Sequence, residues 1–501
     1  MEFSFSPLNL YTNFKEACQN HPSTSMVFDE LLPAFPEIGY ETTYEEVHQA
    51  ILKRAYQLNH MRLKKHDFLI IFKSSRFDTY LLAVAASYLG IIPVMISYHF
   101  KEDTLAVFQE RLDDPYIIYD DVTSPVIDKL QSHKAFSVRD LVLEDEEPIS
   151  QQFLKEDEIS YITHTSGTTG IPKLICHSAI SMGWRVYWHC LIFSKIDRID
   201  RIGFLISPVH SRYNIGISSL MKIGYPLMPL SNSKLSVIKS MLTKYPVIAL
   251  ETHPNHFLQW RVLTQTCPEI FKTVKYYHST FDAINNQTMV DFLSTSGHKE
   301  AYFLQVYGQS ECGPMILKVH TLDSLKTDEG RDMGQGLAPL TDARIVDENK
   351  NLLSKNTPGH IQLLSRGRAL TYYKENERFN ENVDGDWWDS GDYGYINDES
   401  HLFLQDRQVD LIKNIESNLQ LEDFLLDHLS FLAEVVIVRD PEGKPQPIIA
   451  INEGQTFDED AWWQAVSDLP YLNKPIIWDY DQFPRTATMK IRRLTIESQL
   501  K

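Results

Sequence analysis

The sequence predicts an α/β fold in which a large N-terminal domain with several sheets precedes a small C-terminal α+β domain. Apolar, β-branched runs alternate with helical patterns over much of the chain, which is typical of buried, mostly parallel sheets. Beyond about Met333, short strand-like runs separated by turn residues replace this alternation. The 501 residues suffice for about three compact units at ~150 residues each.

The first β-α-β unit is predicted between residues 67 and 96. Residues 67–72 form an apolar strand, Ser74 or Ser75 caps a helix through Tyr88, and residues 91–96 follow Gly90 as the next strand. Similar apolar runs predict strands at residues 115–119, 203–206 and 302–307, the second of them leading into a run at 218–221. This order indicates α/β layers.

The C-terminal part is predicted to form a separate domain. Short runs at residues 343–346, 360–364 and 393–397 lead to a boundary close to Asp406, which divides the chain into domains 1–405 and 406–501. Strands at 434–438 and 448–452, a helix near 460–466 and a basic end then make up the small domain.

Composition and charge exclude several classes of protein. The chain has 48 Lys and Arg against 67 Asp and Glu, a net charge of −19, so a global basic surface for nucleic acid is excluded. Five scattered cysteines without a C-x-x-C pair indicate reduced thiols. The start lacks a signal-peptide pattern, and the most apolar segment, 81–96, is too short and broken to span a membrane. We expect a cytoplasmic protein.

A glycine- and hydroxyl-rich loop at residues 163–173 is the sharpest local signal. Its glycines let successive N–H groups converge on phosphate oxygens, its hydroxyls add donors, and its lysine adds a positive charge. The alternative is a plain Ser/Thr/Gly turn, and the spacing does not match a Walker A loop. The candidate polyphosphate-binding residues are Thr165, Ser166, Gly167, Thr168, Thr169, Gly170 and Lys173.

A second candidate segment follows the strand predicted at residues 303–306 and comprises Tyr307, Gly308, Gln309, Ser310 and Glu311. A carboxylate beside a hydroxyl at the end of such a strand is suited to hold Mg²⁺ through Glu311 and a phosphate through Ser310. A hydrolase elbow is a rival interpretation, but Cys312 stands where that motif requires glycine. A strand followed by a solvated loop is the plain alternative.

Two further segments carry candidate residues. Asp392, in a predicted tight glycine turn, is a suitable acceptor for paired ribose hydroxyls, and Arg407 lies where it can reinforce that contact. An acidic turn with a salt-bridged surface strand is the alternative. Near the end, residues 484–493 are basic. A solvated helix face explains Arg492 and Arg493, whereas Lys490 is a candidate functional residue.

Together these four segments resemble the adenylate-forming superfamily of AMP-forming acyl-CoA synthetases, luciferases and peptide-synthetase adenylation domains. They occur in the family's order along most of the chain. The resemblance implies ATP, Mg²⁺ and coenzyme A as ligands, with Lys490, Glu311 and Ser310 catalytic, Glu311 holding the metal, and Lys490 reaching the acyl carboxylate and the α-phosphate. It implies activation of a carboxylic acid, of short, branched or medium chain, to an acyl-adenylate and then to acyl-CoA.

The resemblance also indicates which residues line an acyl pocket, although the spacing of the gating segment differs from that of the family. The residues that correspond to its wall are His210, Tyr213, Asn214, Ser279, Thr280 and Phe281. Tyr213 is preferred over His210 as the gating residue, and Asn214 in place of an aspartate argues against an amino-acid substrate. The bulky groups at 278–282 are expected to narrow the acyl channel.

Several positions depart from the family pattern and leave alternatives open. Asp406, Glu416 and Met489 replace usual glycines, and Val409 stands at the hinge position. These departures put the thioester half-reaction in more doubt than adenylation. Delivery of the acyl group to a carrier protein and a non-catalytic adenylate-binding protein therefore remain alternatives, and a homodimer is possible.

Overall fold

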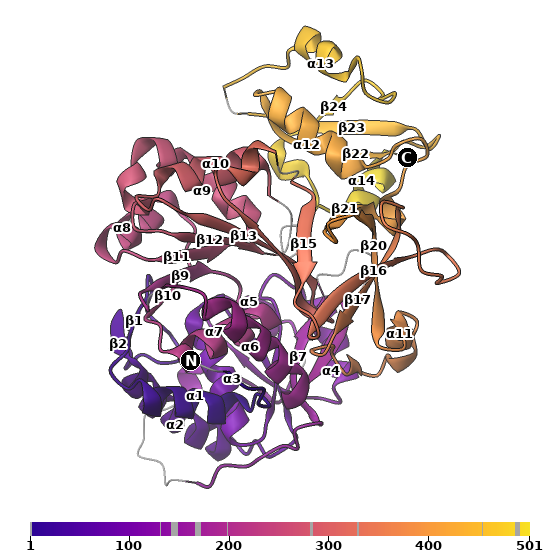
Figure 1. Ribbon diagram of the computed structural model, residues 1–501. Helices are drawn as coiled ribbons and strands as arrows, with labels where there is room; N and C mark the ends of the chain where they lie inside the picture. Colours follow the sequence, from indigo (N-terminus) through magenta and orange to yellow (C-terminus); the bar gives the residue numbers. More distant parts are fainter. Residues whose placement is uncertain are drawn as a thin grey trace.

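The computed structural model describes residues 3–130, 132–141, 149–165, 172–197, 199–280, 284–327, 330–452, 454–485 and 491–500. In these ranges the chain forms three sheets with helices packed against them (Figure 1). None of the helices in these ranges is both long and apolar enough to cross a membrane.

The largest sheet joins a parallel half to an antiparallel half. Strands β9, β11, β12 and β13 run parallel, and β13 then turns back into β14, which begins the antiparallel half. In spatial order its strands are β16 (Thr341–Val346), β17 (Gly359–Ser365), β20 (Trp387–Ile396), β21 (Leu402–Arg407), β15 (Asp332–Gly336), β14 (Gly313–His320), β13 (Tyr302–Gln309), β12 (Tyr276–Thr280), β11 (Ala249–Thr252), β9 (Ile202–Leu205), β10 (Leu227–Pro229), β1 (Ser25–Val27) and β2 (Glu41–Thr43), with β19 (Val383–Asp384) beside β20.

The second sheet carries the strands on either side of the glycine-rich loop. Strand β7 leads into this loop and β8 leads out of it as its antiparallel partner. The spatial order is β18 (Thr371–Tyr372), β8 (Leu174–Ser178), β7 (Ile159–His164), β4 (Ile92–Met95), β3 (Phe68–Phe72), β5 (Tyr116–Tyr119) and β6 (Ala135–Ser137).

The third sheet belongs to the C-terminal part, which lies at the top of Figure 1, far from the N-terminal helices. It consists of β22 (Leu432–Arg439), β23 (Pro445–Ile451) and β24 (Ile476–Ile477). The α-helices are α1 (Leu10–Asn20), α2 (Tyr44–His60), α3 (Phe77–Tyr88), α4 (Glu102–Arg111), α5 (Ser124–Ile127), α6 (Ala179–Phe193), α7 (Ser211–Ile223), α8 (Leu235–Lys244), α9 (Pro254–Thr266), α10 (Asn286–Thr295), α11 (Asn376–Asn380), α12 (Asn418–His428), α13 (Glu459–Val466) and α14 (Arg493–Gln499).

Two buried cores cover the two faces of the parallel strands. On one face, Leu250, Tyr277 and Phe303 pack with residues of α8, α9 and α10. On the other, Phe204 packs with residues of α3 and α7. Because neighbouring residues of a strand point to opposite faces, Glu251 and His278 lie on the face opposite to Leu250 and Tyr277.

The predicted fold class is confirmed, with local corrections. The β-α-β unit exists, and β3 and β4 are parallel. The N-cap of α3 is Arg76 rather than a serine, and it makes no side-chain capping bond. Ser74 is unavailable as a cap because its N–H and hydroxyl both donate to Asp120. Asp406 and Arg407 belong to β21 of the large sheet, and the domain division at 405/406 stays a prediction.

Candidate active site

The glycine-rich loop is closed at its neck by Thr165 and Lys173. The Thr165 N–H donates to the Lys173 carbonyl at 3.0 Å, and the Lys173 N–H donates to Thr165 Oγ1 at 3.1 Å. Predicted phosphate-binding residues Ser166, Gly167, Thr168, Thr169 and Gly170 lie outside the described residues. The neck nevertheless fixes where the loop leaves and rejoins the second sheet.

Lys173 and Glu311 meet through the hydroxyl of Tyr372, although the three residues are far apart in sequence. The Tyr372 hydroxyl donates to Glu311 Oε1 at 2.6 Å, and Lys173 Nζ donates to the same hydroxyl at 3.0 Å. Lys173 Nζ also lies 4.4 Å from the centre of the Tyr372 ring, as in a cation–π contact. The second sheet is thereby joined to the end of β13.

Burial and the neighbouring charges shift the pKa values of Lys173 and Tyr372. Burial lowers the pKa of Lys173, and the charge of Glu311 opposes that effect. Burial and then Glu311 raise the pKa of Tyr372 above its ordinary value, so this hydroxyl remains a proton donor. A carboxylate held by a neutral donor keeps its other oxygen as a metal ligand.

Arg185 of α6 holds the turn that carries Ser310 and Glu311. Its guanidinium donates to the carbonyls of Ser310 at 3.1 Å, Glu311 at 2.8 Å and Gly367 at 2.7 Å. Burial lowers the pKa of Arg185 to about 10, so the group stays charged at neutral pH. A Cβ at Gly313 would lie 2.8 Å from Arg185, and Gly313 has a φ of +85°, which explains the glycine there.

Asp392 is bound by the two residues on either side of Gly308. Asp392 Oδ2 accepts from the Tyr307 hydroxyl at 2.6 Å and from Gln309 Nε2 at 3.1 Å. A Cβ at Gly308 would approach the Gly313 carbonyl to 2.2 Å, so only glycine fits between the two strands. Burial and then Asp392 raise the pKa of Tyr307, which keeps it a donor.

The structure corrects the local geometry predicted for these motifs. Tyr307, Gly308 and Gln309 belong to β13, which extends past the ends predicted at residues 306 and 307 because β14 pairs with it. Asp392 lies inside β20 rather than in a tight turn, although Gly391 has a φ of +73°. Arg407 is the residue opposite Asp392 in β21, so both side chains point to the same face of the sheet.

The predicted pocket residues do not all lie in the same surroundings. Ser279 and Thr280 end β12, and His210 precedes α7 with its ring 6.4 Å from that of His164. Tyr213 instead packs against aromatic rings of α3 and β9. The centre of its ring lies 5.6 to 6.3 Å from the ring centres of Phe77, Tyr80 and Phe204. This packing places Tyr213 in the core between helices, and its gating role stays a prediction.

Asn214 accepts from the Ser218 hydroxyl at 3.3 Å. It points away from Arg212, because residues two apart on a helix lie on nearly opposite sides. Phe281 and Lys490 lie outside the described residues, so their predicted roles stay predictions.

Sequence reasoning missed several residues of this site. Tyr372 and Arg185 carry no motif signal, because each acts through contacts with residues 61 to 199 positions away. The contacts of Arg212 and Glu251 with His278 were missed as well, although residues 278–282 were placed beside the acyl pocket. The one local signal for these contacts is the spacing of Arg212 and Gly216, an arginine followed by a glycine one helical turn later.

The site fits Mg²⁺ held together with a phosphate ligand. Among the described residues no group of three or more His, Cys, Asp or Glu side chains is placed to bind a metal by itself. Mg²⁺ is usually bound through one or two carboxylates plus substrate phosphates, and Glu311 supplies one carboxylate next to Lys173 and the loop neck.

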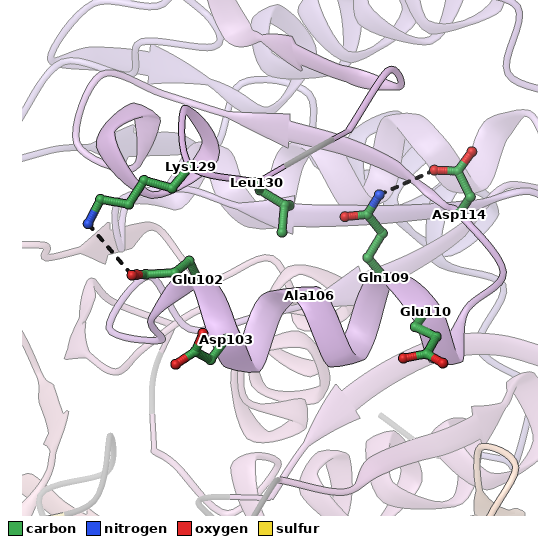
Figure 2. A pocket seen from close by; sticks show the side chains of 8 residues that line it. All are labelled: Glu102, Asp103, Ala106, Gln109, Glu110, Asp114, Lys129 and Leu130. Carbon is green, nitrogen blue, oxygen red and sulfur yellow. Dashed lines mark hydrogen bonds and ion pairs between the residues drawn. The ribbon is translucent and has the colours of Figure 1, made fainter.

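A separate surface cavity has no part in this arrangement. It lies along α4 and is lined by acidic and amide side chains with Lys129 and Leu130 (Figure 2). Lys129 pairs with Glu102 at 3.7 Å, and Gln109 donates to Asp114 at 3.3 Å. None of the candidate site residues lines this cavity.

The comparisons with known proteins agree with the geometry. A family model described as "AMP-binding enzyme" matches residues 14–373. A 3-amino-2-hydroxy-4-methoxybenzoate diazotase of Streptomyces cremeus is 29% identical over 96% of this chain and 93% of its own length. A 2-succinylbenzoate–CoA ligase of Bacillus cytotoxicus is 21% identical over 91% of this chain and 94% of its own.

Solved structures show the same fold. One is the O-succinylbenzoate coenzyme A synthetase of Bacillus subtilis in complex with ATP and magnesium ion, with a TM-score of 0.80 and 18% identity over 99% of this chain and all of that one.

Proposed function

Because this chain belongs to the AMP-binding enzyme family, we propose that it activates a compact carboxylic acid with ATP and Mg²⁺ and transfers the acyl group to coenzyme A. The single observation that carries this proposal is the continuous network from the loop neck through Lys173, Tyr372 and Glu311, together with the Tyr307–Gln309–Asp392 contacts at the end of the same strand. One ATP molecule can extend along that strand end.

Each part of this network has a task in adenylation. When a carboxylate attacks the α-phosphate, negative charge accumulates on the phosphates and on the leaving pyrophosphate, so fixed cations and donors are needed there. Lys173 and the loop hold the β- and γ-phosphates, and Asp392 accepts from the ribose hydroxyls. Glu311 would hold Mg²⁺, which would supply positive charge next to the leaving pyrophosphate. Lys490 reaches the acyl carboxylate and the α-phosphate from the C-terminal part.

The acid is proposed to be a substituted benzoate or similar aryl acid. The sequence alone favours a short, branched or medium-chain acyl group. The diazotase of Streptomyces cremeus and the CoA ligase of Bacillus cytotoxicus are both named for benzoate derivatives, and the polar residues around His278 suit a substituted ring better than an alkyl chain.

A second candidate function is diazotisation of an aryl amine, favoured by the 29% identity to a diazotase over 96% of this chain. Diazotisation needs nitrogen at the oxidation level of nitrite. ATP would activate a nitrite oxygen in place of a carboxylate oxygen, and pyrophosphate would leave. The amine nitrogen then attacks the activated nitrogen, AMP leaves, and the resulting nitrosamine takes up a proton and loses water to give the diazonium ion.

Pyrophosphate exchange into ATP tests the proposal. The purified chain is assayed with benzoate, 2-succinylbenzoate, isobutyrate, hexanoate and nitrite, and its fold is verified by circular dichroism. Exchange that depends on an aryl acid is expected. Folded protein that shows no exchange with any acid contradicts the proposal, and exchange with nitrite alone favours diazotisation.

The acceptor is identified in a second step. Free coenzyme A, a phosphopantetheine-loaded carrier protein, and an aryl amine are offered to the enzyme with the acid that supports exchange. Coenzyme A is expected to give acyl-CoA, AMP and pyrophosphate in equal amounts. If the acyl group is transferred only to the carrier protein, the acceptor is a protein partner and not coenzyme A.

A further inference from the structure

A second polar cluster lies beside the network described above, on the face of the large sheet that α6 and α7 cover. Glu251 is the residue before the last of β11, and His278 is its direct neighbour on β12. Arg212 reaches this pair from α7. The buried side chains of Arg212 and Glu251 are only 6% and 8% exposed.

Charge pairing holds the cluster together. Arg212 Nη2 donates to Glu251 Oε2 at 2.5 Å, and His278 Nδ1 lies 3.1 Å from Glu251 Oε1. Burial alone would raise the pKa of Glu251, but Arg212 and then His278 and His189 lower it to about 2. The carboxylate is therefore ionised and pairs with the charge of Arg212.

The helix sequence makes room for the Arg212 guanidinium. A Cβ at Gly216, one turn further along α7, would lie 2.3 Å from Arg212 Nη1. Residues four apart lie on the same face of a helix, so the glycine lets the guanidinium fold back along α7 toward Glu251.

Several polar atoms of this cluster have no hydrogen-bond partner among the described residues. They include Arg212 Nε, His189 Nε2, His278 Nε2 and Ser279 Oγ. His189 Nδ1 lies 2.9 Å from the Arg185 carbonyl and must donate to it, and burial, then Arg212, lower the pKa of His189 far below its ordinary value. The His189 Nε2 atom is therefore an acceptor, whereas Arg212 Nε is a donor.

Buried donors and acceptors without partners are costly. A ligand that completes this set must carry groups able both to donate and to accept hydrogen bonds. Hydroxyl and amino substituents do both, an alkyl chain does neither, and a second carboxylate only accepts.

We propose that the cluster of Arg212, Glu251, His278, His189 and Ser279 is the part of the substrate pocket that recognises hydroxyl or amino substituents, so that the substrate is a hydroxy- or amino-substituted aromatic acid. This inference rests on the proposed function for the location of the acid. It adds the substrate class and the residues that select it.

The test compares two acids that share a carboxylate but differ in their substituents, 3-amino-2-hydroxybenzoate and benzoate. Binding of each to the full chain is measured by isothermal titration calorimetry without ATP, and kcat/KM for pyrophosphate exchange is measured with ATP. The polar acid is expected to bind at least about 100-fold more tightly, because a site built for hydrogen bonds rejects an analogue that lacks them.

Two variants test whether the cluster causes the preference for the polar acid. Arg212→Lys keeps a positive charge opposite Glu251 but removes the Nε donor, and Ser279→Ala removes one hydroxyl. Each is expected to reduce the preference for the polar acid about 10-fold. Ser219→Ala is the matched control, because Ser219 is also fully buried but donates to the Ile215 carbonyl of its own helix, and it should leave the preference unchanged.

The outcomes separate this inference from the proposed function. Equal binding of the two acids, no binding of either, or an unchanged preference in both cluster variants overturns the inference. Preferential binding of the polar acid without any exchange supports the inference and contradicts the proposed acid activation.

Discussion

The Tyr372 hydroxyl contacts both charged groups that flank the proposed metal position. It donates to Glu311 and accepts from Lys173. A phenol at this place fixes the carboxylate orientation without neutralising it, because the raised pKa of Tyr372 keeps its proton in place. The metal ligand is therefore oriented before ATP binds.

Replacing Tyr372 by phenylalanine tests this role. A hydrogen bond to a charged group contributes about 1.5–3 kcal/mol, so Tyr372→Phe should lower kcat for adenylation about 10- to 100-fold. Tyr373→Phe is the control, because Tyr373 packs by its ring against Phe68. Stopped-flow pyrophosphate release measures both, and equal rates for the two variants would contradict the assignment.

Asp406 of β21 is expected to make the stability of the protein depend on pH. Burial raises its pKa to about 7, although the Asn418 N–H donates to its Oδ2 at 2.8 Å. Between about pH 4 and 7 the folded state keeps a proton that the unfolded state has released, so stability falls as pH rises through this range.

Thermal unfolding at pH 5 and pH 8 tests the Asp406 assignment. Wild type should have the lower Tm at pH 8, and Asp406→Asn, which cannot ionise, should show a smaller decrease. The assignment is wrong if the variant loses as much Tm as wild type over this range.

Among structural elements, the β13–β14 hairpin carries most of the site. It presents Tyr307 and Gln309 to Asp392 before its turn and Glu311 to Tyr372 within the turn. Arg185 of α6 fixes that turn by its three carbonyl contacts. The orientation of Glu311 therefore depends on a side chain of α6.

The Arg185 guanidinium is expected to act as a positioning group. Arg185→Lys keeps the charge but cannot reach three carbonyls at once, so the Mg²⁺ concentration for half-maximal exchange should rise about 10-fold. Arg366→Lys is the control, because Arg366 lies over Trp184 at 5.0 Å. A loss of Tm without a change in the Mg²⁺ requirement would indicate a purely structural role.

Local patterns predicted the elements better than their pairing. Apolar, β-branched runs located β3, β5, β9, β22 and β23 because each strand is short and buried. They did not reveal that β14 extends β13 through the motif, which depends on a hairpin partner. The two-residue strand β18 has no periodic pattern at all, so neither it nor its Tyr372 was foreseen.

At the scale of the whole molecule, motifs far apart in sequence meet at the junction of two sheets. The neck of the loop belongs to the second sheet, Glu311 and Asp392 to the large sheet, and Tyr372 connects them. The order of the motifs predicted this site in outline. The sequence placed residues 278–282 beside the acyl pocket. It did not predict that Arg212, Glu251 and His189 join them, because these residues come from α7, β11 and α6 and have no common sequence motif.

The C-terminal part is expected to supply the catalytic lysine to this junction. Lys490→Ala should abolish adenylate formation while ATP binding remains, because Lys490 is assigned to the acyl carboxylate and the α-phosphate in the transition state. Lys474→Ala is the control, since Lys474 forms an exposed pair with Glu459 at 2.9 Å. Unchanged exchange in Lys490→Ala would show that another group has this role.

We expect Glu311 and Asp392 to belong to one site for a single ATP molecule. Calorimetric titration of the full chain with ATP and Mg²⁺ checks this with wild type, Glu311→Gln and Asp392→Asn. One ATP should bind per chain, and its affinity should be reduced about 10-fold or more in each variant. Full affinity in either variant, or two independent ATP sites, would contradict it.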